Sequence, residues 1–224
     1  MTTLQAMSAV LMGTLSTPFS QRSVNALRSS ATAIGDNYLL NEKTAAWPVI
    51  AEAALAAKNS AETDVNAPAT RTVTTFEKEL LSQSEDFLLT SIRAQVIRDV
   101  ETLVQRYREF AIEAQIFPSA NKTIAAMDRV NFEFMDRTGR VYSSTKYIRT
   151  TWRQTLVSLA AEFYLIGAIS NGATSVTVQN PDPENQWVGF EFNLTDYAQS
   201  MTSFLDVRDE IFHPNSNATL KAVI

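Results

Sequence analysis

The sequence contains few side chains that could do chemistry, and their number limits that chemistry further. His213 is the only histidine in 224 residues, and there is no cysteine. A single chain therefore cannot build a two-histidine metal site, a serine–histidine pair, a thiolate zinc site or a disulfide. Pro214 follows His213, so we expect this histidine in a surface turn, with a pH-sensing or interface role as the alternative.

Carboxylate pairs are the remaining candidates for acid–base catalysis or cation binding. Three such pairs are Glu77 with Glu79, Glu109 with Glu113, and Asp209 with Glu210. Arg106 and Arg108 flank the second pair, which is typical of a solvated, charged helix face. The sequence also lacks a glycine-rich phosphate loop, a nucleophile elbow and an acidic calcium loop. We therefore predict no enzyme activity and no catalytic, cofactor-binding or metal-binding residues.

The strongest charge asymmetry is a basic segment without any acidic residue. It contains Arg137, Arg140, Lys146, Arg149 and Arg153, with Tyr142, Tyr147 and Trp152 between them. An acidic segment follows at 182–210, where seven Asp and Glu residues stand against Arg208 alone. Three interpretations stay open: the two segments pair within the chain, they join neighbouring subunits, or the basic segment contacts nucleic acid.

Overall charge and hydropathy narrow the class of protein. The net charge is −5, which argues against coating of nucleic acid by the whole surface but allows a local basic face. No stretch approaches the roughly 20 apolar residues that span a bilayer. The apolar N-terminus has no Lys or Arg before Arg22, unlike a secretory signal. We expect a soluble protein without membrane partners.

A long helix is predicted over 74–117. Thr74 or Thr75 is the candidate N-cap, acidic residues follow in the first turn, and Pro118 ends the helix. Its second half carries apolar residues at alternating steps of four and three, which is the period of a seam held against another helix. The predicted assembly seam comprises Val96, Val100, Leu103, Tyr107, Phe110, Ala114 and Phe117.

The rest of the chain is expected to form an arm, a linker and an α+β body. The arm, 1–58, has small-residue helices near 3–14, 19–34 and 45–58, with a turn at Gly35-Asp36-Asn37. The linker is the polar stretch 59–73. The body, 74–224, adds a helix at 145–169, β-hairpins near 130–142 and 175–192, and an apolar, strand-like end from Ala218 to Ile224. The predicted fold is α+β and predominantly helical.

The seam, the arm and the separated charges favour a structural subunit of a large assembly. The chain has no cysteine, has one histidine, and is rich in Ala, Ser, Thr and Asn. In this composition it resembles structural proteins of tailed-bacteriophage virions. That resemblance implies a scaffold role in the head, connector or tail, in rings or helical stacks of copies and other structural proteins. The location would then be the virion, and otherwise the cytoplasm. The alternatives are a nucleic-acid-binding coat or nucleoprotein, and an enzyme or small-ligand module with an unfamiliar site.

Overall fold

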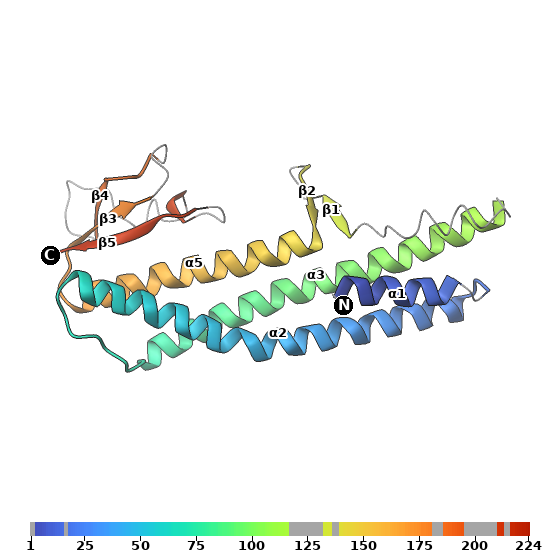
Figure 1. The fold of residues 1–224 in the computed structure, drawn as a ribbon, viewed down its shortest axis with the longest axis horizontal. Helices are drawn as coiled ribbons and strands as arrows, with labels where there is room; N and C mark the ends of the chain where they lie inside the picture. Colours follow the sequence, from blue (N-terminus) through green and yellow to red (C-terminus); the bar gives the residue numbers. More distant parts are fainter. Residues whose placement is uncertain are drawn as a thin grey trace. The chain divides into compact units, whose positions relative to one another are not determined.

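The fold is α+β and predominantly helical, as predicted (Figure 1). The computed structural model describes residues 3–15, 18–116, 132–135, 139–180, 186–194, 210–212 and 216–224. The elements, in chain order, are helices α1 (Thr3–Leu15), α2 (Gln21–Asp64) and α3 (Thr75–Ile116), strands β1 (Glu133–Met135) and β2 (Val141–Ser143), helix α5 (Ser144–Ser170), and strands β3 (Ser175–Gln179), β4 (Glu191–Asn193) and β5 (Thr219–Val223).

The predicted long helix is present as α3, and its N-cap is Thr74. The backbone N–H of Glu77 donates to Thr74 Oγ1 at 3.2 Å, and the backbone N–H of Thr74 donates to Glu77 Oε2 at 2.7 Å. These reciprocal bonds form a capping box, which satisfies two N–H groups that a helix start leaves without partners. The local sequence Thr-x-x-Glu therefore fixes where α3 begins.

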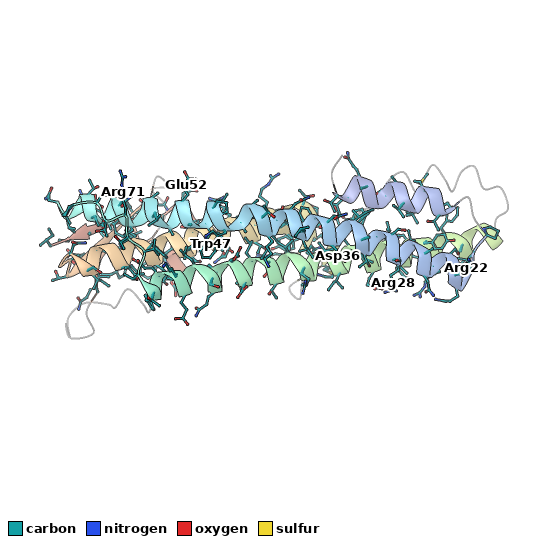
Figure 2. The ribbon with its side chains drawn as sticks, turned by 90° about the horizontal axis from the view of Figure 1, so that it is seen from below. Arg22, Arg28, Asp36, Trp47, Glu52 and Arg71 are labelled. Atoms are coloured by element: carbon teal, nitrogen blue, oxygen red, sulfur yellow. The ribbon has the colours of Figure 1, made fainter. Side chains whose placement is uncertain are left out.

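The separate helices predicted at 19–34 and 45–58 are wrong, because one helix, α2, runs from Gln21 to Asp64. Figure 2 shows Asp36, Trp47 and Glu52 along its ribbon. The helix passes through Pro48, which has no N–H to donate to the carbonyl of Thr44. This missing bond lies where the chain divides into its two compact units, between Thr44 and Ala45.

Gly35 explains why the predicted turn is helical instead. A Cβ atom at residue 35 would lie 2.3 Å from Val96 Cγ1, far inside van der Waals contact. The glycine therefore allows α2 to approach α3 closely and is not there to turn the chain. A glycine in the sequence does not by itself show whether it forms a turn or allows two helices to approach closely.

The predicted linker, 59–73, is shorter than expected because α2 continues to Asp64. Asn66 has a positive φ of 55°, and the N–H of Ala67 donates to the carbonyl of Glu62 at 2.7 Å. This is the geometry of a Schellman C-cap. The following non-helical residues are tied back to α2, because Glu62 Oε2 accepts the backbone N–H of Thr70 at 2.6 Å.

Unit 1 comprises residues 1–44 and 89–149. Within it, the second half of α3 packs against the first half of α2: Tyr107 donates its hydroxyl to Ser23 Oγ at 2.9 Å, and its ring lies 5.5 Å from that of Phe19. Arg28 and Glu101 add an exposed ion pair across the same two helices.

Helix α1 and the first hairpin complete the described part of unit 1. Met7 and Leu11 are the buried residues of α1. The two short strands β1 and β2 pair as the predicted first hairpin.

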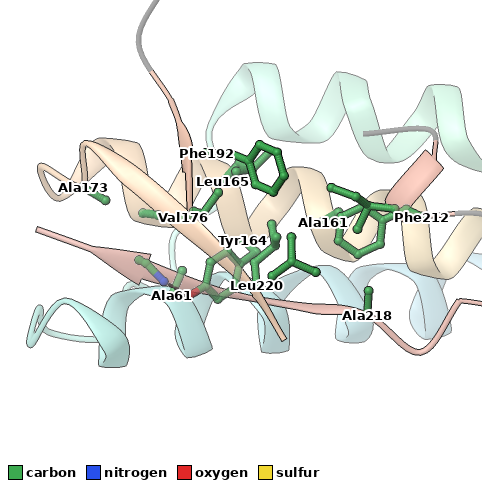
Figure 3. Close-up of a cluster of buried hydrophobic side chains, with 14 of the residues drawn as sticks. Ala61, Ala161, Tyr164, Leu165, Ala173, Val176, Phe192, Phe212, Ala218 and Leu220 are labelled. Carbon is green, nitrogen blue, oxygen red and sulfur yellow. Dashed lines mark hydrogen bonds between the residues drawn. The ribbon is translucent and has the colours of Figure 1, made fainter. Parts of the chain in front are cut away.

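Unit 2 comprises residues 45–88 and 150–224 and holds a three-stranded antiparallel sheet in the order β4-β3-β5. Strands β3 and β4 form the predicted second hairpin, and the strand-like end of the chain is β5. The hydrophobic core of the unit gathers Ala61 of α2, Tyr164 and Leu165 of α5, and Val176 and Phe192 of the sheet (Figure 3). Alternate residues of β5 are buried, as a strand with one packed face requires.

The close approach at Gly35 yields a first prediction. Gly35→Ala should destabilise the protein by about 1–3 kcal/mol, because the new methyl group overlaps Val96 Cγ1. Urea denaturation followed by circular dichroism measures this change. Gly13→Ala is the matched control: nothing lies within 4 Å of its added Cβ, so helix propensity should leave it neutral or up to about 1 kcal/mol more stable.

The double variant Gly35→Ala with Val96→Ala should lose less stability than the sum of the two single changes, because the smaller side chain makes room for the methyl group. Additive losses, or a Gly35→Ala protein as stable as the wild type, would contradict the close packing of α2 on α3.

Candidate functional site

The predicted assembly seam is largely covered by the chain itself. Val96, Val100, Leu103 and Tyr107 are each at most 6% exposed, and Phe110 is half-buried. Phe117 lies outside the described residues, and so does the side chain of Ala114. Helix α2 of the same chain covers part of this seam, because Gly35 lies against Val96 and Ser23 accepts the hydroxyl of Tyr107. A contact with another subunit must therefore use other surfaces of unit 1 than these four buried side chains.

The basic segment is divided by the fold. Arg140, Lys146 and Arg149 are exposed in unit 1, whereas Arg153 belongs to unit 2 and donates to the carbonyl of Ser216 and to Asn217 Oδ1 at 3.2 and 2.6 Å. Arg137 lies outside the described residues. Two aromatic rings of the segment carry cations above them: Lys146 lies 5.7 Å from the centre of Tyr142, and Arg98 lies 5.1 Å from that of Tyr147.

A buried carboxylate fixes the start of α5 in unit 1. Ser144 Oγ donates to Asp99 Oδ2 at 2.5 Å, and Gln95 Nε2 donates to Asp99 Oδ1 at 2.9 Å. The backbone N–H of Ser144 also donates to the carbonyl of Phe132, just before β1. Since β2 ends at Ser143, these bonds position the hairpin and the first turn of α5 together (Figure 1).

The ionisation of Asp99 is opposed by its surroundings. Burial raises the pKa of the Asp99 carboxyl, and the hydrogen bonds from Ser144 and Gln95 and the charge of Arg98 offset only part of that rise. Gln95 Oε1 is buried and makes no hydrogen bond with any described group. A proton on Asp99 would remove the buried charge. It could be donated to Gln95 Oε1 only after the Gln95 amide turned over, because Nε2 is the atom that now faces Asp99 Oδ1.

A cavity of about 350 Å³ lies beside Asp99 within unit 1. Its polar lining includes Tyr38, Asp99 and Ser144, and its apolar lining includes Leu4, Met7, Val96 and Ile148. Burial, followed by the hydrogen bond and charge of Glu42, raises the pKa of Tyr38, so its phenol stays protonated at neutral pH. The Ser144 hydroxyl donates to the Asp99 carboxyl in this lining, and the raised pKa makes that carboxyl a stronger base in its ionised form.

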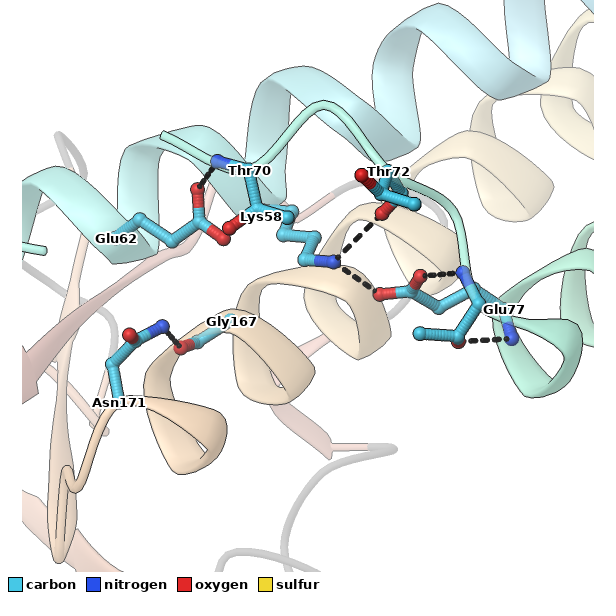
Figure 4. A network of polar contacts seen from close by, with 8 residues as sticks. Lys58, Glu62, Thr70, Thr72, Glu77, Gly167 and Asn171 are labelled. Carbon is cyan, nitrogen blue, oxygen red and sulfur yellow. Dashed lines mark hydrogen bonds and ion pairs between the residues drawn. The ribbon is translucent and has the colours of Figure 1, made fainter. Parts of the chain in front are cut away.

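A second buried network fixes the start of α3 in unit 2 (Figure 4). Lys58 Nζ donates to Glu77 Oε1 at 2.6 Å and to the carbonyl of Thr72 at 3.5 Å. The two side chains of this ion pair are 7% and 1% exposed. Burial raises the pKa of Glu77, but the hydrogen bonds from Lys58 and Thr74 outweigh it and hold that pKa below its usual value of 4.5.

Two further contacts hold α5 in unit 2. A Cβ atom on Gly167 would lie 2.9 Å from the carbonyl oxygen of Lys58, so α5 and α2 meet there at backbone distance. Tyr164 donates its hydroxyl to Asp64 and accepts the backbone N–H of Ala222 at 2.7 Å. This single hydroxyl therefore joins α2, α5 and β5 of unit 2.

Each unit also exposes large apolar side chains. On unit 1, Met135 and Val141 are cross-strand partners, 68% and 55% exposed, on the side of the hairpin that also carries the exposed Glu133. Lys146 and Arg149 are exposed on the first turns of α5, and Lys146 lies over the ring of Tyr142, which belongs to the other side of the hairpin. On unit 2 we define the acidic face as Phe76, Glu79, Asp86 and Phe87 of α3. Its two rings are 64% and 57% exposed.

Sequence reasoning missed the two buried networks because their members look ordinary in the sequence. Asp99 is one of several acids on a charged helix, and Ser144 lies in the middle of the basic segment. The one available signal was spacing: Gln95 and Asp99 lie in line with the apolar seam, where a polar residue needs a buried partner. Nothing in the sequence pairs Lys58 with Glu77.

Comparisons with known proteins identify no relative. No protein-family model matches the chain, and neither the curated proteins nor the solved structures include a significant match. Among the residues that the structure describes, no group of three or more His, Asp or Glu side chains is placed to hold a metal ion. No helix of the described parts of the chain is long and apolar enough to cross a bilayer. The candidate functional surfaces are therefore the exposed apolar side chains of the two units.

The Lys58–Glu77 pair yields a prediction about stability. Glu77→Gln should cost about 3–5 kcal/mol at pH 7, because it leaves the Lys58 ammonium buried without a counter-charge. Adding Lys58→Met should recover most of the loss, since glutamine can still close the capping box and the remaining pair is uncharged. Urea denaturation measures all three proteins. Equal loss in the single and double variants would contradict a buried, mutually dependent pair.

The Lys58–Glu77 pair also predicts how part of the stability of the folded protein depends on acid pH. The pKa of Glu77 is lower in the folded than in the unfolded protein, so its contribution is present above about 4.5 and is lost as the pH falls through the folded value. The stability difference between wild type and Glu77→Gln should therefore shrink with acid. A difference that stays constant down to the folded-state pKa and below would contradict it.

Asp99 should show the opposite pH dependence. Its pKa is raised by folding, so its contribution is complete below the unfolded value near 3.8 and is lost as the pH rises through the folded value. Asp99→Asn, which resembles the protonated acid, should be at least as stable as the wild type at pH 7, by about 1.4 kcal/mol per unit of pKa rise. The two proteins should converge near pH 3.

Denaturation curves from pH 3 to 8 test this expectation. Asp99→Ala is the control, because it removes the acceptor of Ser144: it should destabilise the protein by about 1–3 kcal/mol near pH 3, and its difference from the wild type should change with pH in parallel with that of Asp99→Asn. An Asp99→Asn protein that is clearly less stable than the wild type at pH 7 would show that the folded protein prefers the ionised carboxylate.

Proposed function

We propose that this chain is a non-enzymatic structural subunit of a large protein assembly. It acts by packing against copies of itself and against other structural proteins. The observation that carries the proposal is the exposure of Phe76, Phe87, Met135 and Val141, each of which is more than half exposed. Large apolar side chains gathered at a surface and bordered by charge are characteristic of protein–protein contacts.

The seam of α3 has a different role in this proposal from the one its sequence pattern indicated. Because α2 covers Val96 and Tyr107 within the chain, the seam stabilises the subunit, and the outer faces meet neighbours. The compositional resemblance to structural proteins of tailed-bacteriophage virions favours a virus particle, in its head, connector or tail, as the assembly. A rigid helical framework with exposed docking faces is what such a component needs.

A nucleic-acid-binding coat is the second candidate, and the exposure of Lys146 and Arg149 favours it. Lys146 lies over the ring of Tyr142, and a base could stack beside such a pair. Arg153 counts against a continuous basic track, because it holds Ser216 and Asn217 instead. The third candidate, a small-ligand module, is favoured by the cavity beside Asp99.

Fractionation of the native source tests the proposed function. Material from that source is separated by rate-zonal sedimentation and probed with an antibody raised against the chain, with and without nuclease. We expect the chain in fast-sedimenting, nuclease-resistant particles far larger than its own 24.8 kDa. Sedimentation as a free small protein would overturn the proposal, and release by nuclease would favour the nucleic-acid alternative.

A further inference from the structure

The cavity beside Asp99 has the size of a small-molecule site and belongs to one unit. Its volume is about 350 Å³, and pockets that hold small ligands begin at about 300 Å³. Its lining residues come from α1, α2, α3 and α5, and all of them lie in the segments 1–44 and 89–149 of unit 1. The cavity can therefore be considered without reference to the other unit.

One part of the lining is apolar. Leu4 and Met7 come from α1, Val96 comes from α3, and Ile148 comes from α5. Met7 and Val96 are at most 6% exposed. A hydrocarbon group placed against these side chains would be removed from water, which favours binding. This part of the cavity provides affinity for an apolar body but no preference for a charge.

The other part of the lining is polar and acidic. Its residues are Thr3, Tyr38, Asp99, Ser144 and Thr145. Burial raises the pKa of Tyr38, and the hydrogen bond and charge of Glu42 and the charge of Asp99 raise it further, so both carboxyls lie near the phenol. No Lys or Arg is among the lining residues that the structure describes. The polar part of the cavity therefore favours a positively charged group.

Asp99 can accept a further hydrogen bond. It is 4% exposed and accepts one bond from Ser144 and one from Gln95, whereas a carboxylate has about four acceptor positions. Burial raises the pKa of Asp99, and these two bonds and the charge of Arg98 offset only part of that rise. A cation in the cavity would supply the counter-charge that the buried carboxylate needs.

We propose that this cavity binds a small organic cation, in which one ammonium group is joined to an apolar body. The ammonium donates to the Asp99 carboxylate beside Tyr38, and the apolar body packs against the apolar lining. The inference goes beyond the proposed function, because binding within unit 1 does not require assembly. Since the site is lined by four helices, the bound cation also stabilises the folded unit.

Two ligands that differ in charge test the proposal on the full chain. Phenethylamine carries an ammonium group at pH 8, and phenethyl alcohol has a neutral hydroxyl on the same apolar body. Titrations followed by protein NMR measure both affinities and show which residues shift. The wild type should bind the amine at least about tenfold more tightly, because a charged donor strengthens the bond to a carboxylate. Apolar burial alone would favour the alcohol, since an ammonium is more costly to remove from water.

Asp99→Asn is the decisive variant, because it removes the charge and keeps the size of the side chain. It should lose the roughly tenfold preference for the amine, while its affinity for the alcohol changes by less than about threefold. Leu4→Trp should fill the apolar part and weaken both ligands. Ala9→Trp is the matched control at an exposed position of the same helix and should weaken neither. Circular dichroism with thermal melting checks that each variant folds like the wild type.

The proposal fails on any of four results. Absence of saturable shifts at the lining residues would show that the cavity takes neither ligand. Equal affinity of the wild type for amine and alcohol would exclude a site for a cation. An Asp99→Asn protein that keeps the preference would exclude an ammonium at this carboxylate. Tighter binding of acetyl-lysine amide, acetylated at its α-nitrogen, would assign the cavity to a lysine side chain of a partner protein. The sedimentation test of the proposed function is independent of all four.

Discussion

Close packing of α2 on α3 determines which surfaces of unit 1 are open to partners. Residue 35 has no space for a side chain because Val96 occupies it, and Tyr107 donates its hydroxyl across the same interface to Ser23. Burying an apolar seam inside one chain releases it from water without any partner. A seam that is already buried cannot also bind a neighbour, so the proposed contacts with neighbours must use the outer sides of the helices and the hairpin.

The outer faces depend on two buried polar networks for their geometry. Asp99 binds the hydroxyl of Ser144 where the hairpin meets α5, and Glu77 both caps α3 and binds Lys58. Polar groups that lose water must find hydrogen-bond partners inside the protein, which restricts the chain to few arrangements. The networks have opposite ionisation preferences, because Lys58 favours the charged form of Glu77 and burial favours the neutral form of Asp99.

Charge is partitioned unevenly between the units: unit 1 has 13 Lys and Arg against 9 Asp and Glu, and unit 2 has 6 against 15, so their formal charges are +4 and −9. A surplus of one sign within a unit is repulsive and offers that unit no stability. It becomes favourable when the surface meets one of the opposite sign, and exposed apolar side chains such as Phe76 and Met135 then gain a partner that excludes water.

The sequence by itself determined the elements whose signals are local. Periodicity and capping residues predicted α3, α5, both hairpins and the final strand, and they narrowed the N-cap of α3 to Thr74 or Thr75, because hydrogen bonds between near neighbours depend on few residues. Only the tertiary structure decided how the chain uses Gly35 and Pro48, which occur within α2 although both commonly end helices. It also decided the partner of the seam, the pairing of Lys58 with Glu77, and the separation of Arg153 from Lys146 and Arg149. These depend on contacts between residues far apart in the chain, about which the spacing of residues in a single sequence carries no information.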